Sequence, residues 1–353
     1  MGAPRIWIDV LTPKQVVFFA PMIERFRSSS CEVLATSRRY REVEPIAKMQ
    51  GLDLVYVGER GGAGLAEQLA AATRRQAEIA PRIRRFGPHV SMSVASGVCA
   101  RVSFGLGVRH VAVNDSPHSE VAGRLSLPLS YHLLCPWIIP FGAWAKFGVE
   151  RSRITRYRAL DPAAWLKRKA RRGPVPRLSS RRKTIVVRLE ESYAPYMAGT
   201  SRTWNDAVLQ ALGDSFPDAN LVALCRYGDQ LRHVKTEFGR SFIIPEEVVD
   251  GRGLLEMTDA FVGMGGTMTA ESALMGVPAT SAFQGSLFTE SYLRSVGLLA
   301  KSRSPAEVAR HVDRLLGRGV KARHTKKARR VLDSMEDPVP RIASFILSTA
   351  EQA

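Results

Sequence analysis

The chain has few cysteines and no long apolar run, and both shortages limit what it can be. Its four cysteines lie far apart among 353 residues and form no CxxC pair or Cys/His cluster. Such spacing indicates neither a structural zinc site nor a disulfide framework. No segment reaches the roughly 20 apolar residues that cross a bilayer. The N-terminal residues lack the basic and then apolar order of a signal peptide, so we expect a cytoplasmic protein.

Acidic residues are also scarce, which leaves a large excess of positive charge. The sequence has 51 Lys and Arg against 33 Asp and Glu, a formal net charge of +18. Such proteins attract nucleic acid, anionic membranes or phosphorylated ligands. The sequence contains no helix-turn-helix, zinc-finger or RNP motif, which argues against a nucleic-acid partner. Two basic blocks, 167–172 and 321–330, indicate a solvated linker or helix face, or peripheral contact with the inner face of an anionic membrane.

Short apolar runs alternate with helical patterns along most of the chain. In the first half, β-type runs begin near residues 6, 33, 53, 90, 110 and 132. The alternation restarts later, with strands expected over 184–188, 220–224, 242–244, 260–262 and 279–283. This order predicts parallel sheets covered on both faces by helices. We therefore predict an α/β fold of two doubly wound Rossmann-like domains that face each other across a cleft.

A basic segment containing glycine, prolines and serines separates the two halves and favours an irregular linker. The predicted parts are an N-terminal domain over 1–166, a linker over 167–183, a C-terminal domain over 184–336, and a helix over 337–353 that could pack back on the N-terminal domain. In open α/β sheets, ligands bind beyond the carboxyl ends of the strands. The loops after the strands therefore supply the candidate site residues.

The most informative segment runs from Asp259 to Pro278. An apolar run ends in a glycine-rich sequence, and we expect a Thr-rich turn before the next helix. Glycines let the backbone approach a ligand closely, and the free N–H groups of a helix start favour a diphosphate. The predicted substrate-binding residues are Gly265, Gly266, Thr267, Met268, Thr269 and Glu271. The alternative is a buried strand–turn–helix whose glycines serve packing alone.

Lys14 follows the first expected strand. Thr12 suits the N-cap and Pro13 the first helical position, so Lys14 would lie in the first helical turn. A cation there opposes the helix dipole, which makes an anion beside it the better explanation. We predict that Lys14 contacts the ligand; the alternative is an exposed lysine.

The loop after the fifth strand gathers residues that can transfer protons. Asp115, His118 and Glu120 are the catalytic candidates, and Arg124 is a substrate-binding candidate. Asp115 could instead serve the Ser-Pro turn, and His118 could be a surface histidine. Glu120 and Arg124 stand four residues apart, so they could form an intrahelical ion pair.

The strand ends of the second half carry further candidates. Arg188 could bind phosphate as a planar fork. Glu190 and Glu191 could contact an acceptor or pair with Arg188, and Arg226 or Tyr227 could flank a nucleotide base. Arg188 and Glu190 are the two that we predict to bind substrate.

Several motifs together resemble a known family over nearly the whole chain. They are 7–15, 113–118, 136–140, 159–162 and the Gly265 segment. These motifs resemble a prokaryotic family designated domain of unknown function 354. The two-domain layout and the sequence Gly-Gly-Thr-Met-Thr-Ala-Glu also look like GT-B glycosyltransferases and the related UDP-N-acetylglucosamine 2-epimerases.

The resemblance implies a role for each part of the glycine motif. Gly265, Gly266 and Thr267 would meet a diphosphate, and Glu271 would hold the ribose of a nucleotide sugar. In the epimerases a loop resembling His-Val-Glu-Ala-Gly-Leu-Arg follows the fifth strand. The corresponding loop here, 114–124, has a different arrangement of acids.

The leading hypothesis is a glycosyltransferase that uses a nucleotide sugar, with a UDP-sugar as donor and an acceptor that could be membrane-associated. One of the three catalytic candidates would deprotonate the acceptor hydroxyl. No Asp-x-Asp motif is present, so we expect neither a metal ion nor another required cofactor. The alternatives are a nucleotide-sugar 2-epimerase and a non-catalytic protein that binds nucleotide or nucleic acid.

Overall fold

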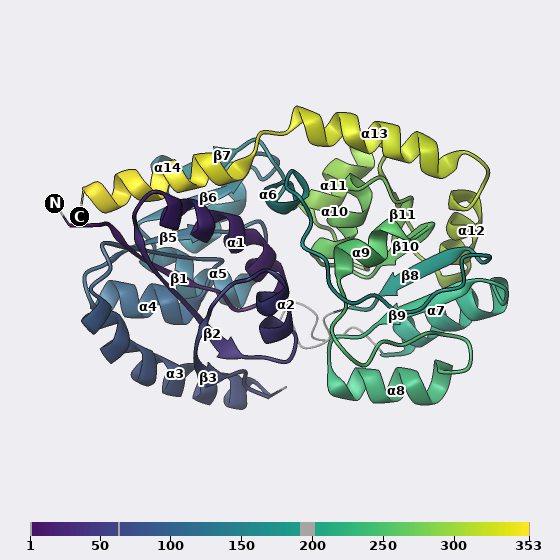
Figure 1. Cartoon of the computed structure of the whole chain (residues 1–353), viewed down its shortest axis with the longest axis horizontal. Helices are drawn as coiled ribbons and strands as arrows, with labels where there is room; N and C mark the ends of the chain where they lie inside the picture. Colours follow the sequence, from purple (N-terminus) through teal and green to yellow (C-terminus); the bar gives the residue numbers. More distant parts are fainter. Residues whose placement is uncertain (1, 63, 191–201, 353) are drawn as a thin grey trace. The chain divides into compact units, whose positions relative to one another are not determined.

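The computed structural model describes residues 2–62, 64–190 and 202–352. The chain divides into two units (Figure 1), of which the first comprises residues 1–169 and 336–353 and the second comprises residues 170–335. Each unit is built around its own parallel sheet. The predicted α/β fold with two parallel sheets is therefore confirmed.

The first unit contains a seven-stranded sheet among its described residues, in the order β3-β2-β1-β4-β5-β6-β7. The strands are β1 Arg5–Asp9, β2 Glu32–Arg39, β3 Val55–Glu59, β4 Val90–Ser93, β5 Arg109–Val113, β6 His132–Pro136 and β7 Ile154–Tyr157. The α-helices are α1 Pro13–Ser28, α2 Val43–Met49, α3 Leu65–Phe86, α4 Gly97–Gly105, α5 Glu120–Ser126, α6 Ala163–Leu166 and α14 Pro338–Glu351. Short 3-10 helices span Leu127–Leu129, Phe141–Phe147 and Arg151–Arg153.

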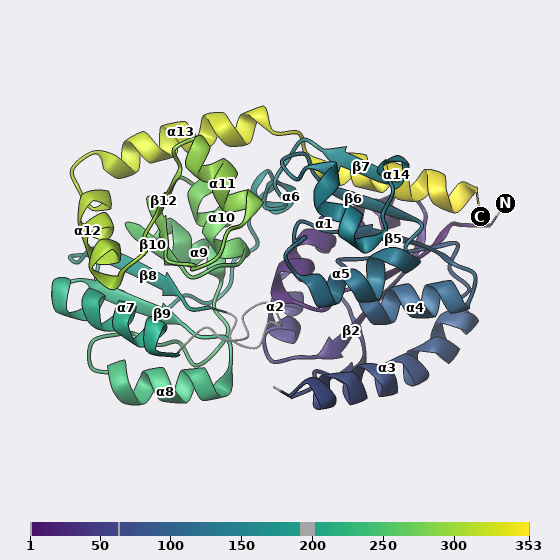
Figure 2. The same ribbon diagram turned by 180° about the vertical axis from the view of Figure 1, so that it is seen from behind.

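Helices cover both faces of this sheet (Figures 1 and 2). One set, α1, α2, α6 and α14, forms contacts among its members, and α3, α4 and α5 form the other. The C-terminal helix α14 contacts α1, α6, β4 and β7. The central strands β1, β4, β5 and β6 are almost wholly buried, as is typical of a parallel sheet, whereas β2, β3 and β7 toward the edges are partly exposed.

The second unit contains a five-stranded sheet among its described residues, in the order β12-β11-β10-β8-β9. The strands are β8 Thr184–Arg188, β9 Asn220–Leu224, β10 Ala260–Gly263, β11 Ala279–Ser281 and β12 Leu299–Lys301. The helices are α7 Arg202–Ser215, α8 Gly228–Phe238, α9 Gly251–Glu256, α10 Thr267–Leu274, α11 Phe288–Ser295, α12 Pro305–Leu315 and α13 Val320–Ser334.

The strand predicted over 242–244 does not form. Ile243 makes a single bridge to Val222, beside the edge strand β9. Pro245 follows two residues later and has no N–H group, so the ladder cannot extend in that direction. The prediction was therefore wrong in taking a short apolar run for a paired strand.

Two strands that the sequence analysis did not predict, β7 and β12, lie at sheet edges and have four and three residues. Segments this short show little periodicity, so pairing with a neighbour defines them. The basic block 321–330 lies within α13, on a helix rather than in a linker. Among the described residues, no helix combines the length and apolar character needed to cross a membrane.

Candidate functional site

In the first unit, three loops at the carboxyl end of the sheet bring one lysine and two aspartates together. Lys14 lies in the first turn of α1, which follows β1; Asp115 follows β5, and Asp161 follows β7. The Lys14 Nζ lies 2.6 Å from Asp115 Oδ2 and 2.7 Å from Asp161 Oδ2. The side chains of Lys14 and Asp115 are 17% and 15% exposed, and that of Asp161 is fully buried. We call these three residues the ion-pair cluster.

Local sequence explains why Lys14 lies at a helix start. The Thr12 hydroxyl accepts a hydrogen bond from the Gln15 N–H, and Pro13 occupies the first turn. Both are favoured there, whereas a cation opposes the helix dipole. Two carboxylates of the chain itself supply negative charge beside Lys14, and a contact between Lys14 and a ligand stays a prediction.

Asp161 is a member of the cluster that the sequence analysis did not select. It lies in one of the motifs that carry the family resemblance, 159–162, so a signal was present. The Tyr157 hydroxyl donates a hydrogen bond to Asp161 Oδ1. Tyr157 is also buried, and it fixes the carboxyl group against Lys14.

The surroundings shift the pKa values of Asp161 and Asp115 in opposite directions. Burial raises the pKa of Asp161 to about 6, although Lys14 opposes the shift. Burial also opposes ionisation of Asp115, but Lys14 and the Ser116 hydroxyl outweigh it and lower the Asp115 pKa. Burial disfavours the Lys14 ammonium, yet the two carboxylates raise the pKa of Lys14. Two carboxyl groups whose pKa values differ in this way are suited to opposite roles, one as the acid and the other as the base.

Asp115 belongs to a turn that side-chain hydrogen bonds close. The Asn114 side chain accepts a hydrogen bond from the Ser116 N–H at 2.8 Å, and the Ser116 hydroxyl donates to Asp115 Oδ1 at 2.7 Å. His118 is half-buried, and burial lowers its pKa despite the nearby Asp115 carboxylate. A neutral imidazole can accept a proton.

Glu120 and Arg124 lie on the surface of α5, where they form the intrahelical ion pair that their spacing allows. The Arg124 Nη2 lies 2.8 Å from Glu120 Oε1, and both side chains are more than half exposed. Their roles in catalysis and substrate binding stay predictions.

In the second unit, β10 leads into α10 through a glycine turn. Gly265 and Gly266 have φ angles of +88° and +86°, which side chains other than hydrogen rarely allow. A Cβ at Gly265 would lie 3.0 Å from the Phe283 ring. Gly266 caps α10, so Thr267 opens the helix itself instead of belonging to the Thr-rich turn that we predicted.

The side chains of α10 differ in their surroundings. Thr269 is buried, and its Oγ1 has no hydrogen-bond partner among the described residues. The Met268 side chain approaches Gly251 of α9, since a Cβ there would lie 3.6 Å from Met268 Cε. Glu271 is half-buried in the middle of the helix.

Two arginines lie at the carboxyl ends of neighbouring strands. A Cβ on Gly266 would lie 3.1 Å from Arg226 Nη2, which places this guanidinium at the start of α10. Arg188, at the end of β8, donates a hydrogen bond from Nη1 to the Cys225 carbonyl at 3.3 Å. The helix start, the glycine turn and Arg226 together form a positively polarised region suited to an anion.

Glu190, two residues after the end of β8, is buried. Its Oε1 accepts a hydrogen bond from Asn205 Nδ2 at 3.4 Å, and its carbonyl accepts one from Gln230. These contacts tie Glu190 to α7 and α8. Glu191 lies outside the described residues. Among the residues that the structure does describe, no group of three or more His, Cys, Asp or Glu side chains is arranged to hold a metal ion.

With its two parallel sheets, the chain has a fold like that of GT-B glycosyltransferases and UDP-GlcNAc 2-epimerases. The glycosyltransferase SnogD from Streptomyces nogalater aligns over 99% of this chain and 100% of its own, with a TM-score of 0.64 and 17% identity. The UDP-GlcNAc 2-epimerase from Neisseria meningitidis, solved with UDP-GlcNAc bound, covers 99% and 100% of the two chains, with a TM-score of 0.72 and 10% identity.

The chain belongs to the family described as protein of unknown function (DUF354), which it matches over residues 4–349. It is also similar to the uncharacterized protein MJ0665 of Methanocaldococcus jannaschii. The two are 24% identical over 331 residues, which cover 89% of this chain and 92% of the relative.

Proposed function

We propose that this protein is a glycosyltransferase that takes a nucleotide sugar, a UDP-sugar in the first instance, as donor. The observation that carries the proposal is the positively polarised start of α10. Two glycines with positive φ open the backbone there, and the Arg226 guanidinium lies against Gly266. Free N–H groups and a planar cation suit a diphosphate.

We assign proton transfer to the first unit. In transfer, the acceptor oxygen bonds to the anomeric carbon, the bond from that carbon to the diphosphate breaks, and the acceptor proton passes to a base. Asp115 and His118 can accept that proton, because a carboxylate and a neutral imidazole are both bases. Lys14 keeps the two carboxylates of the ion-pair cluster in place, a role that its contacts support better than direct phosphate binding.

The proposal is tested with a panel of nucleotide sugars that differ in base and sugar. Isothermal titration calorimetry and thermal shift should detect one of them, together with its nucleoside diphosphate. The Arg226→Gln variant should bind that ligand at least about tenfold more weakly, because a charge-assisted contact contributes roughly 1.5–3 kcal/mol. If no member of the panel binds the unmodified protein, a nucleotide-sugar function is ruled out.

A second candidate function is 2-epimerisation of a nucleotide sugar. It is supported by the higher TM-score with the epimerase, 0.72 against 0.64 for the transferase. The opposite pKa shifts of Asp115 and Asp161 would also suit removal of a proton by one carboxylate and return by the other. Mass-neutral conversion of a UDP-sugar with incorporation of solvent deuterium would identify this reaction, whereas transfer leaves the sugar carbons unlabelled.

We further propose peripheral contact with an anionic membrane, which would suit a membrane-associated acceptor. The helix α13 supports this proposal because its exposed side chains are dominated by lysine and arginine. Such a helix gains about 1 kcal/mol for each basic residue near an anionic surface.

A further inference from the structure

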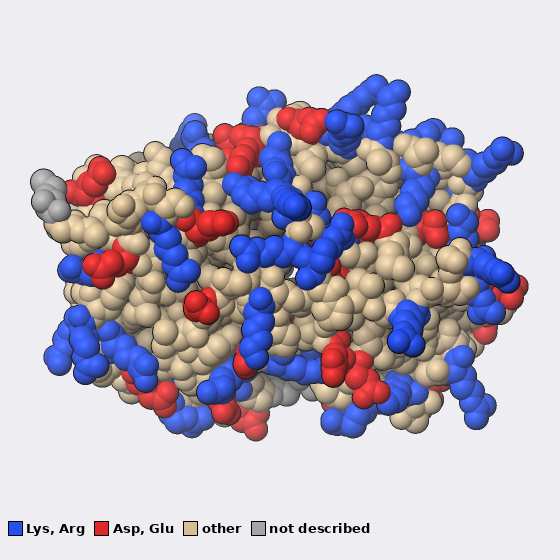
Figure 3. Space-filling model, viewed as in Figure 1, with Lys and Arg blue, Asp and Glu red and all other residues tan. Residues whose placement is uncertain are grey.

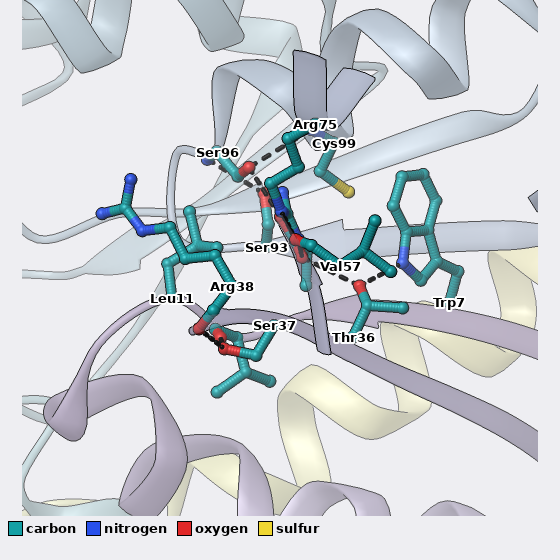
Figure 4. Close-up of polar contacts among 12 residues, drawn as sticks. Trp7, Leu11, Thr36, Ser37, Arg38, Val57, Arg75, Ser93, Ser96 and Cys99 are labelled. Atoms are coloured by element: carbon teal, nitrogen blue, oxygen red, sulfur yellow. Dashed lines mark hydrogen bonds and ion pairs between the residues drawn. The ribbon is translucent and has the colours of Figure 1, made fainter. Parts of the chain in front are cut away.

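At the carboxyl end of the first sheet, Asp9 forms a buried ion pair with Arg75, which is labelled in Figure 4. Arg75 donates from Nη1 and Nη2 to the two Asp9 oxygens at 3.1 and 2.6 Å. The hydroxyls of Thr36 and Ser96 each donate to the same carboxylate at 2.8 Å. Both Asp9 oxygens are therefore occupied by hydrogen bonds, and the carboxylate has its ion-pair partner in Arg75.

Arg38 is a second cation beside this pair, and it has no such partner. It lies one residue before the end of β2, and in Figure 4 its side chain extends away from the Arg75 guanidinium. Its Nε is buried without a hydrogen-bond acceptor, and its guanidinium forms no ion pair among the described residues. A half-buried, unpaired guanidinium is costly to a folded protein and calls for a functional reason.

The surroundings of Arg38 add positive charge. Arg60 follows β3, and its N–H donates to the Arg39 carbonyl, so the ends of β2 and β3 lie together. The Arg60 guanidinium lies 4.9 Å from the centre of the Tyr40 ring. Burial, followed by the charges of Arg60 and Arg75, lowers the pKa of Arg38 to about 10, so Arg38 is still a cation at neutral pH. This edge of the sheet is also where open α/β folds bind ligands.

We propose that Arg38, with Arg60 nearby, is the anion-binding subsite for a second substrate, the acceptor, which therefore carries a carboxylate or phosphate group. The inference rests on the proposed function, which assigns the nucleotide diphosphate to the second unit. It adds the charge class of the molecule that receives the sugar. The planar guanidinium, whose Nε is held inside the protein, presents its outer edge to either oxyanion.

The first measurement uses the Arg38 Nε–H signal of the 15N-labelled full-length protein. The signal is assigned by its absence from Arg38→Lys, and burial of Nε should slow its exchange with water. Titration with inorganic phosphate and, separately, with acetate should move this signal, and the stronger binder shows which group the acceptor carries. If neither anion moves it, the proposal is overturned. This measurement uses the unmodified chain, so it does not depend on the folding of a variant.

The second measurement compares calorimetric binding of the same two anions to variants. Arg38→Gln should bind the preferred anion at least about tenfold more weakly, the loss expected when one charge-assisted contact is removed. Arg82→Gln removes the same charge from an exposed position on α3 and should bind it as the unmodified protein does. Equal binding by Arg38→Gln and the unmodified protein would overturn the proposal.

Measurements of UDP binding distinguish a failure of the Arg38 proposal from a failure of the proposed function. Arg38→Gln should bind UDP normally, whereas Arg226→Gln should not. If Arg38→Gln loses UDP binding, Arg38 belongs to the donor and the second-substrate assignment is wrong. If UDP binds to no form of the protein, the proposed function fails, while the phosphate and acetate titrations still decide whether Arg38 binds an anion.

Discussion

At the residue scale, the ion-pair cluster has one positive and two potentially negative charges. Lys14 lies within 2.7 Å of both aspartates, and Asp161 is fully buried. Full ionisation of both carboxyl groups leaves one excess negative charge in a poorly solvated place. Because an excess charge is costly there, the more buried carboxyl group has the higher pKa. Asp161 therefore keeps its proton to a higher pH than Asp115 does.

We predict that Asp161→Asn flattens the pH dependence of stability between pH 4 and about 6.5. The pKa of Asp161 rises from 3.8 to about 6 on folding, so its protonated form stabilises the fold below pH 4 and this contribution is lost as pH rises through 6. A shift of this size corresponds to about 3 kcal/mol. Urea unfolding at several pH values measures it.

The control for this prediction is Asp333→Asn, which changes an exposed carboxylate on α13. It should retain the pH dependence of the unmodified protein. The lowered pKa of Asp115 acts in the opposite sense, because its contribution is lost as pH falls below its ordinary value. An unchanged slope in Asp161→Asn between pH 4 and 6.5 would contradict the prediction.

At the element scale, the start of α10 depends on local backbone conformation and on a neighbouring strand. The turn needs positive φ at two successive residues, which the pair Gly265-Gly266 supplies. Arg226 reaches Gly266 because β9 and β10 both pair with β8. The residues that polarise this helix start therefore come from segments far apart in the sequence.

We predict that Gly266→Ala weakens UDP binding about tenfold. The added Cβ would lie 3.1 Å from Arg226 Nη2 and would hold alanine at a φ of +86°. The strain should also lower the free energy of unfolding by roughly 1–2 kcal/mol. Calorimetry and urea unfolding measure the two effects.

The matched control is Gly105→Ala at the end of α4. A Cβ there meets no atom within 4 Å. This variant should bind UDP normally and be at least as stable as the unmodified protein, because alanine favours helix. Normal UDP binding by Gly266→Ala would show that the glycine turn does not serve the ligand.

At the scale of the whole molecule, the positive charge is spread over the surface. Lysine and arginine side chains are scattered across the whole face in Figure 3, with acidic side chains interspersed among them. The helix α13 departs from this mixture, since it contains the whole block 321–330 and has Asp333 as its one acidic residue. A long-range attraction to anionic surfaces should therefore depend on this helix more than on other basic segments.

We predict that the protein sediments with vesicles containing 30 mol% phosphatidylserine but not with neutral phosphatidylcholine vesicles. Raising the salt to about 0.5 M should release it, because screening shortens the range of the attraction. The triple variant K326A/K327A/R330A should bind at least about tenfold more weakly. The triple variant R74A/R82A/R84A removes equal charge from exposed positions of α3 and should bind normally. Equal binding by both variants would exclude a specific role for α13.

Many elements were predictable from local sequence. Residues 65–86 form α3 over the predicted range, because Glu67 accepts a hydrogen bond from Gly64 at its start and Gly87 takes a left-handed conformation at its end. The strands 184–188 and 220–224 also form as predicted. The segment 242–244 does not, since pairing of so short a run depends on its neighbours and on Pro245.

The sequence by itself determined the class of fold and the glycine turn before α10, because periodic apolar residues and positive-φ glycines act over a few neighbours. It also indicated Lys14 and Asp115 as separate candidates. Only the tertiary structure joined them to Asp161, placed Arg226 against Gly266 and left Arg38 without a carboxylate partner. Those facts depend on which strands become neighbours in a sheet, and no local pattern encodes the distance between residues so far apart along the chain.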